Sequence, residues 1–133
     1  MLSEKDLIGV WRLVSHFYLD EDGSMSDGPL GPGADGLLLY EANGYMAVGM
    51  MRTDHRSDGS ASESDPPPAA YLGYTGRWRV AESQVIHEVA VGSHPRVVNT
   101  EQIRDARLND GRLVLSRPVE GSAQLIAMEW RRA

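Results

Sequence analysis

Apolar and polar residues alternate with a period of two along most of this chain, which is the pattern of half-buried β-strands. In the first such run, residues 9–19, Trp11, Leu13, Ser15 and Phe17 share one face while His16 lies on the other. We expect the face that carries Trp11 to point inwards and His16 to point outwards. The second half of the chain alternates in the same way, so that Tyr74, Trp78, His87, Val89, Val91, Gln102, Arg104, Leu113, Leu115, Met128 and Trp130 are expected to face the interior.

The strongest local signal is a hairpin, in which residues 37–42 and 45–52 flank Asn43-Gly44. An Asn-Gly pair favours a two-residue turn with positive φ, which would pair Ala42 with Tyr45. Both faces of this hairpin are apolar, so the pattern does not distinguish the interior face from the exterior one. One face would line the interior, and the other would pack on the helix, on the long loop or on another subunit, as in a homodimer.

Three segments are predicted outside the strands. Ser3 and Asp6 have the spacing of a capping box, so a short helical turn is expected over residues 5–8. Residues 24–36 contain Pro29 and Pro32 and are expected to form a loop at the mouth of the fold. The Ser-, Asp- and Pro-rich segment 53–70 is predicted to be a flexible flap, which is either an inert surface loop or a lid over a ligand.

Trp11 near the beginning of the chain and Trp130-Arg131-Arg132 near its end lie in the first and last predicted strands. Guanidinium groups stack on indole rings, so these residues suit strands that pair with each other and close a sheet. We therefore predict one all-β domain over residues 1–133, an antiparallel up-and-down β-barrel of about eight strands. A barrel of that size is wide enough for one small ligand.

Composition excludes several classes of partner and cofactor. The net charge of −6 disfavours nucleic acid, and no run of eighteen apolar residues suggests a membrane span. Cysteine is absent, and we expect a cytoplasmic protein. The four histidines show no paired spacing for a metal, and no glycine-rich phosphate loop is present, so neither a metal nor a cofactor is expected.

The order of these features resembles the bacterial lipocalin-like domain family, small intracellular relatives in shape of the secreted lipocalins. The segments that carry the resemblance are residues 7–15, 39–46, 74–78, 85–87, 100–104 and 130–131. These motifs mostly specify the barrel, so the resemblance implies a lipocalin-like fold. Relatives of similar shape include both carriers and cofactor-free catalysts, and the resemblance implies no catalytic set.

Predicted strand pairing brings one set of polar side chains together. If Val80 pairs with Val85, His87 lies beside Trp78, and if Val91 pairs with Thr100, His87 lies beside Arg104. Inside an apolar barrel, Arg104 would hold a carbonyl, enolate or carboxylate and His87 would move a proton, with Tyr74 or Ser15 as further donors. Burial and the adjacent cation would both lower the pKa of the imidazole.

The sequence thus predicts His87, Arg104 and Tyr74 as catalytic residues. The residues expected to contact the ligand are Trp78, Gln102, Ser15, Phe17, Tyr40, Val89 and Met128. The favoured function is cofactor-free proton transfer, cyclisation or elimination on a small, mostly apolar or aromatic organic molecule. The alternatives are a non-catalytic carrier or sensor, and a barrel whose interior is filled by side chains with His87 and Arg104 in a structural network.

Overall fold

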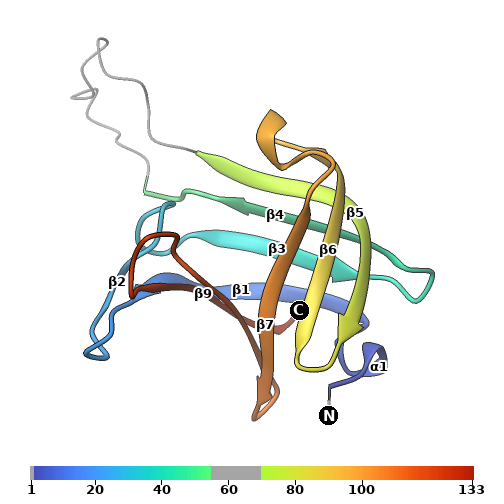
Figure 1. The fold of residues 1–133 in the computed structure, drawn as a ribbon, viewed down its shortest axis with the longest axis horizontal. Helices are drawn as coiled ribbons and strands as arrows, with labels where there is room; N and C mark the ends of the chain where they lie inside the picture. Colours follow the sequence, from blue (N-terminus) through green and yellow to red (C-terminus); the bar gives the residue numbers. More distant parts are fainter. Residues whose placement is uncertain (1, 55–69) are drawn as a thin grey trace.

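The computed structural model describes residues 2–54 and 70–133. The chain folds into α1 (Glu4–Leu7), β1 (Gly9–Leu19), β2 (Met25–Asp27), β3 (Asp35–Tyr40), β4 (Tyr45–Met51), β5 (Tyr71–Ala81), β6 (Gln84–Gly92), the 3₁₀ turn η1 (Pro95–Val97), β7 (Glu101–Asn109), β8 (Arg112–Pro118) and β9 (Leu125–Arg132). Each strand pairs with its neighbour in an antiparallel sheet, and β9 pairs with β1 (Figure 1). Because β2 only adds to one edge of β1, eight strands form a closed barrel, as the sequence predicted.

The seam between β1 and β9 carries the expected tryptophan and arginine. Arg132 lies over the ring of Trp11, with its guanidinium carbon 3.9 Å from the ring centroid. Its Nη1 and Nη2 also donate to the carbonyls of Ile8 and Asp6, at 2.7 and 2.8 Å. The short helix α1 begins at the predicted capping box, where the Asp6 carboxylate accepts a hydrogen bond from the Ser3 N–H. Together these contacts fasten α1 across one end of the barrel.

A β-bulge in β1 reverses which side chains face inwards. Leu13 pairs with Trp130, but Ser15 already pairs with Glu129, so Val14 is an extra residue on β1. The side chains of β1 that face inwards are therefore Trp11 and Leu13 before the bulge and His16 after it. His16 is only 7% exposed. The prediction that His16 points outwards is wrong, because one extra residue exchanges the two faces of a strand.

The hairpin of β3 and β4 is present, but its turn differs from the prediction. The Glu41 N–H donates to Tyr45 O and the Gly44 N–H to Glu41 O, so three residues, 42–44, form the loop. Gly44 takes the positive φ of +91°, and the two-residue pairing of Ala42 with Tyr45 is wrong. The resulting register turns one set of residues into the barrel, namely Leu38, Tyr40, Met46, Val48 and Met50.

Strands β5 and β6 pair as predicted near their turn and diverge further along. Val80 pairs with Val85 and Trp78 with His87. Beyond them Ala90 is an extra residue on β6, so Val91 lies outside and is 66% exposed, contrary to the prediction that it faces inwards. A bulge again exchanges the two faces.

The pairing of β6 with β7 differs from the prediction by two residues. His87 pairs with Gln102, and Arg104 pairs with Val85, so Arg104 is not the direct cross-strand neighbour of His87. The connection between β6 and β7, which contains η1, is longer than predicted. The Val89 N–H donates to Thr100 O and the Asn99 N–H to Val89 O, so the pairing starts at Val89 instead of Val91. A shift of two residues preserves the face, so Gln102 and Arg104 still point inwards.

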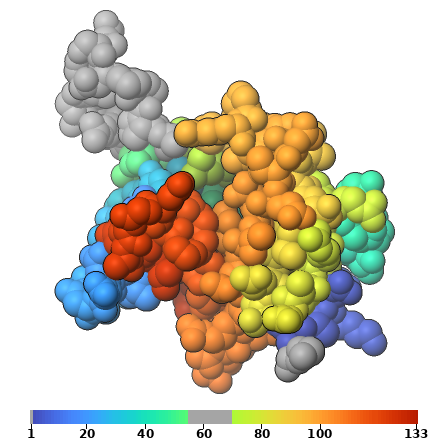
Figure 2. Space-filling view, in the orientation of Figure 1, coloured from blue at the N-terminus to red at the C-terminus, as the bar shows by residue number. Residues whose placement is uncertain are grey.

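The apolar core extends through the barrel interior. Trp11, Leu7, Tyr40, Leu113 and Trp130 are at most 1% exposed there. Side chains of β6 and β7, yellow and orange in Figure 2, cover the interior on the side shown. No helix among the described residues has the length and apolarity to cross a membrane. Most of the predicted flap, residues 55–69, lies outside the described residues.

Candidate functional site

The described residues form two main hollows. A groove of about 580 Å³ lies on the outer face of β3, β4 and β5, and a cavity of about 180 Å³ lies inside the barrel. Residues from the loops near Pro29 and His94 line the interior cavity, which therefore sits towards the end of the barrel that carries η1. Figure 1 shows η1 following the upper end of β6, while α1 lies near its lower end.

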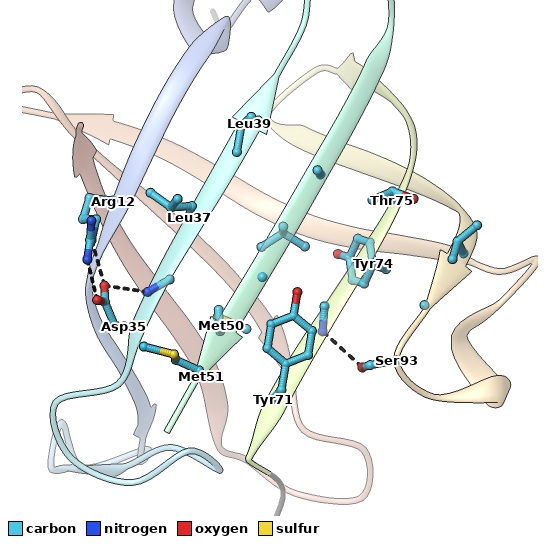
Figure 3. Close-up of a pocket in the computed structure, with 17 residues that line it drawn as sticks. Arg12, Asp35, Leu37, Leu39, Met50, Met51, Tyr71, Tyr74, Thr75 and Ser93 are labelled. Atoms are coloured by element: carbon cyan, nitrogen blue, oxygen red, sulfur yellow. Dashed lines mark hydrogen bonds and ion pairs between the residues drawn. The ribbon is translucent and has the colours of Figure 1, made fainter. Parts of the chain in front are cut away.

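The outer groove is an apolar depression in the sheet surface (Figure 3). The phenol of Tyr71 lies over β4 and β5 where these strands carry Gly49 and Gly73, since a Cβ at either glycine would come within 2.5 Å of the Tyr71 hydroxyl. An ion pair between Arg12 and Asp35 borders the groove. The groove thus offers apolar contact surface, with one ion pair whose charges already compensate each other.

The interior cavity differs because residues that line it carry unpaired polar atoms. Three buried side-chain nitrogens of the described residues have no hydrogen-bond partner: His16 Nδ1, Arg104 Nε and Trp130 Nε1. All three residues line this one cavity, and none of them lines the outer groove. Buried polar groups are nearly always hydrogen-bonded, so three unpaired atoms around a single cavity mark it as the candidate ligand site.

His87 lies at the centre of a chain of two short hydrogen bonds. Its Nε2 is 2.6 Å from the Tyr40 hydroxyl, and its Nδ1 is 2.6 Å from the Tyr74 hydroxyl. Strands β3, β5 and β6 supply these residues, because the register of each places its side chain on the inner face. The hydroxyl of Tyr40 is fully buried, whereas Tyr74 and His87 line the cavity.

Burial keeps this chain uncharged. Burial first, and the positive charge of Arg104 second, lower the pKa of His87 to about 3. Burial raises the pKa of Tyr74 above its ordinary value and that of Tyr40 well above it. At neutral pH the imidazole and both phenols are therefore neutral, as the sequence predicted for His87.

Arg104 is the charged group of the cavity. Its Nη2 donates to Gln102 Oε1 at 3.3 Å and its Nη1 to the Ile103 carbonyl at 3.0 Å. Gln102 is held in turn by Thr100, whose hydroxyl accepts from Gln102 Nε2 at 2.8 Å. No carboxylate pairs with Arg104 among the described residues, and no Asp or Glu of that part of the chain lines the cavity. Its guanidinium charge is therefore not balanced inside the barrel.

His16 enters the same cavity from β1, opposite Met128 of β9. Burial first, then the charges of Arg117 and Arg104, lower the pKa of His16 to about 4. This residue is neutral at pH 7 and carries one of the unpaired nitrogens.

The structure brings together five of the predicted site residues. His87, Arg104, Tyr74, Gln102 and Met128 all line the cavity. Tyr40 lies behind them and contacts the cavity residues through His87. The catalytic role predicted for three of these residues stays a prediction.

Four other predicted residues do not line the cavity. Trp78 belongs to the core, where its indole packs on Tyr40 and donates to the Glu41 carbonyl at 2.9 Å. Val89 is buried outside the cavity lining, and the bulge at Val14 removes Ser15 and Phe17 from the inward alternation.

The predicted site residues did not include five polar residues of the cavity lining: His16, Ser93, His94, Arg117 and Trp130. Trp130 was expected to face inwards as part of the barrel closure, and its unpaired N–H depends on packing that alternation does not describe. His16 was assigned to the wrong face because nothing in residues 9–19 signals the bulge. Among the described residues, no three His, Asp or Glu side chains gather in a way that could hold a metal ion.

Comparison with known protein families agrees with this architecture. A family model described as "Lipocalin-like domain" matches residues 8–133. Similar solved structures include a redesigned β-barrel, at 14% identity and a TM-score of 0.47, covering 98% of this chain and 96% of that one. The wild-type fluorescent protein UnaG is similar at 11% identity and a TM-score of 0.46, covering 97% of this chain and 98% of UnaG. Among curated protein sequences, none matches this chain.

Proposed function

Since this chain belongs to the lipocalin-like domain family, we propose that it binds a small, mostly apolar organic molecule inside its barrel, with Arg104 as the polar anchor. The observation that carries this proposal is the set of unpaired nitrogens of His16, Arg104 and Trp130 around one cavity. Leaving such groups unpaired costs on the order of 1–3 kcal/mol each, and a ligand that supplies partners recovers this free energy.

The rest of the lining supports an apolar ligand body. Leu38, Val48, Met50, Leu115 and Met128 contribute aliphatic side chains to the cavity. Ligand sites are typically of this kind, with predominantly apolar walls and a few polar groups that fix orientation. The volume of about 180 Å³ suits a small molecule or part of a larger one.

The indole N–H groups of the three tryptophans provide a direct test. The N–H of Trp11 donates to the Leu7 carbonyl and that of Trp78 to the Glu41 carbonyl, whereas that of Trp130 is unpaired and belongs to a cavity-lining residue. In a titration with 1-anilinonaphthalene-8-sulfonate followed by ¹H–¹⁵N NMR, we expect the Trp130 indole signal to shift most. The Trp11 and Trp78 signals serve as controls in the same spectrum.

An unchanged Trp130 signal at saturating probe would contradict binding inside the barrel. Native mass spectrometry of protein purified from its own source then identifies the natural ligand as a mass that is released on denaturation. A Trp130→Phe variant removes the reporter and confirms the assignment of the signal.

Proton-transfer catalysis is a second candidate, favoured by the Tyr40–His87–Tyr74 chain. Its two 2.6 Å hydrogen bonds give a path for a proton between the cavity and a buried hydroxyl. The low pKa of His87 makes it a weak base, which is why binding is the primary proposal. A catalyst would convert the co-purified molecule, and His87→Gln would stop conversion while binding persists.

A further inference from the structure

Hydrogen-bond accounting fixes the direction of the chain through His87. Tyr40 is 0% exposed, and His87 Nε2 is the one side-chain partner that its hydroxyl has among the described residues. If Nε2 carried a proton, the Tyr40 hydroxyl would accept it and its own O–H would be buried without an acceptor. Because buried donors are rarely left unpaired, Tyr40 donates to Nε2.

The proton of the neutral imidazole is then on Nδ1, and it is donated to the Tyr74 hydroxyl at 2.6 Å. The oxygen of Tyr74 is thereby used as an acceptor, while its own O–H has no acceptor among the described residues. Tyr74 lines the cavity, so this hydroxyl is available to donate to a ligand.

Three residues that line the cavity therefore carry donors without acceptors. The Tyr74 O–H joins the unpaired Nε–H of Arg104 and the unpaired indole N–H of Trp130. Guanidinium and indole nitrogens only donate, and the Tyr74 oxygen already accepts a hydrogen bond from His87. A complementary ligand must bring oxygen atoms that accept several hydrogen bonds at once.

The charge of the cavity points in the same direction. Arg104 and Arg117 both line it, and no Asp or Glu of the described residues does. A half-buried guanidinium without a counterion is unfavourable, although the protein as a whole has a net charge of −6. A monoanion with two oxygens balances the charge of this guanidinium, and both oxygens can accept hydrogen bonds from it. A neutral alcohol or amide does not balance the charge.

We propose that the barrel selects organic acids in their deprotonated form, with the carboxylate bound by Arg104, Tyr74 and Trp130 and the apolar body against the aliphatic wall. This inference rests on the proposed binding function and names its ligand class. It makes Tyr74 a ligand-binding residue and Tyr40 and His87 the residues that orient its hydroxyl.

Matched probes test the ligand class by calorimetry at pH 7. Octanoate should bind at least about 10-fold more tightly than octanamide, because the amide has the same chain length without the charge. Arg104→Gln should lower octanoate affinity by about 10- to 100-fold and so remove most of the advantage of octanoate over octanamide. Arg107→Gln, an exposed arginine on the same strand, is the matched control and should preserve the preference.

Tyr74→Phe should lower octanoate affinity by about 10-fold, with the exposed Tyr45→Phe as its control. Equal affinities for octanoate and octanamide would overturn the carboxylate inference and leave the proposed binding function intact. Binding of neither probe, with an unshifted Trp130 indole, would overturn both.

The proton position has a readout that needs no ligand and no substitution. The ¹⁵N chemical shifts of the His87 imidazole distinguish a protonated nitrogen from an unprotonated one. We expect the proton on Nδ1 in the wild-type protein. A proton on Nε2 would overturn the assignment of the Tyr74 hydroxyl as a donor to the ligand.

Discussion

At the scale of single residues, two neutral histidines inside the barrel connect the site to stability. Burial lowers the pKa of His16 to about 4 and of His87 to about 3, against an ordinary value of 6.5. Between these values and pH 6.5, the unfolded chain binds protons that the folded chain does not. Acid therefore favours the unfolded state, and the full contribution of both residues is present only above about pH 6.5.

This linkage predicts a pH dependence of unfolding. Between pH 7 and pH 5, protonation of each histidine in the unfolded chain should lower the free energy of unfolding by about 2 kcal/mol. Urea denaturation across this range should show a smaller loss in His87→Gln and His16→Gln than in the wild-type protein, and the smallest in the double variant. The same loss in all four proteins would contradict the assignment of these residues as buried and neutral.

At the scale of elements, two bulges determine which side chains reach the cavity. Val14 on β1 turns His16 inwards, and Ala90 on β6 turns Val91 outwards. On β5, opposite the second bulge, Gly76 leaves room for the backbone of β6, since a Cβ there would lie 1.9 Å from the Glu88 carbonyl oxygen. The close approach of β5 and β6 at this point requires glycine.

Gly76→Ala should accordingly destabilise the protein by about 3 kcal/mol or more, because the strands must separate where Tyr74 and His87 are positioned. Thermal and urea unfolding measure the change. Gly121→Ala is the control: it has a φ of +74° but open space around its Cα, so only backbone strain of about 1 kcal/mol is expected. Equal losses in the two variants would contradict steric contact at Gly76.

The same elements explain what could be predicted from sequence. Alternation and turn residues were sufficient for the eight strands of the closed barrel and for the pairing of Trp78 with His87. The prediction that residues 24–36 form only a loop is wrong, because β2 pairs with β1 over residues 25–27 and β3 begins at Asp35. The alternation also predicted that Gln102 and Arg104 face inwards on β7. This is the case although the register of β7 differs from the prediction by two residues. An inserted residue such as Val14 changes neither composition nor propensity, so the place of His16 in the cavity could not be predicted.

At the scale of the whole molecule, the barrel depends on its seam. Arg132 joins β9 to Trp11, Ile8 and Asp6. The side chain of the neighbouring Arg131 is exposed and, among the described residues, donates only to the Arg132 carbonyl. Substitution of either arginine removes one positive charge, but only substitution of Arg132 also removes contacts across the seam.

Arg132→Ala should lower the free energy of unfolding by about 1–2 kcal/mol, since it removes a cation–π contact and two hydrogen bonds. Arg131→Ala should change it by less than about 0.5 kcal/mol. Chemical denaturation of both variants at one salt concentration provides the comparison. A larger effect of Arg131→Ala would contradict the role assigned to Arg132.

The ring also constrains the kinetics of folding. The hydrogen bond from Arg132 to Ile8 joins positions 124 apart in the chain, so the pairing of β1 with β9 must overcome a large loop entropy. Without that pairing the barrel would be an open sheet with two unsatisfied edges, which are templates for aggregation. A ligand that binds only the closed barrel would slow the opening of the barrel. The bound ligand is therefore also expected to set the lifetime of the folded protein.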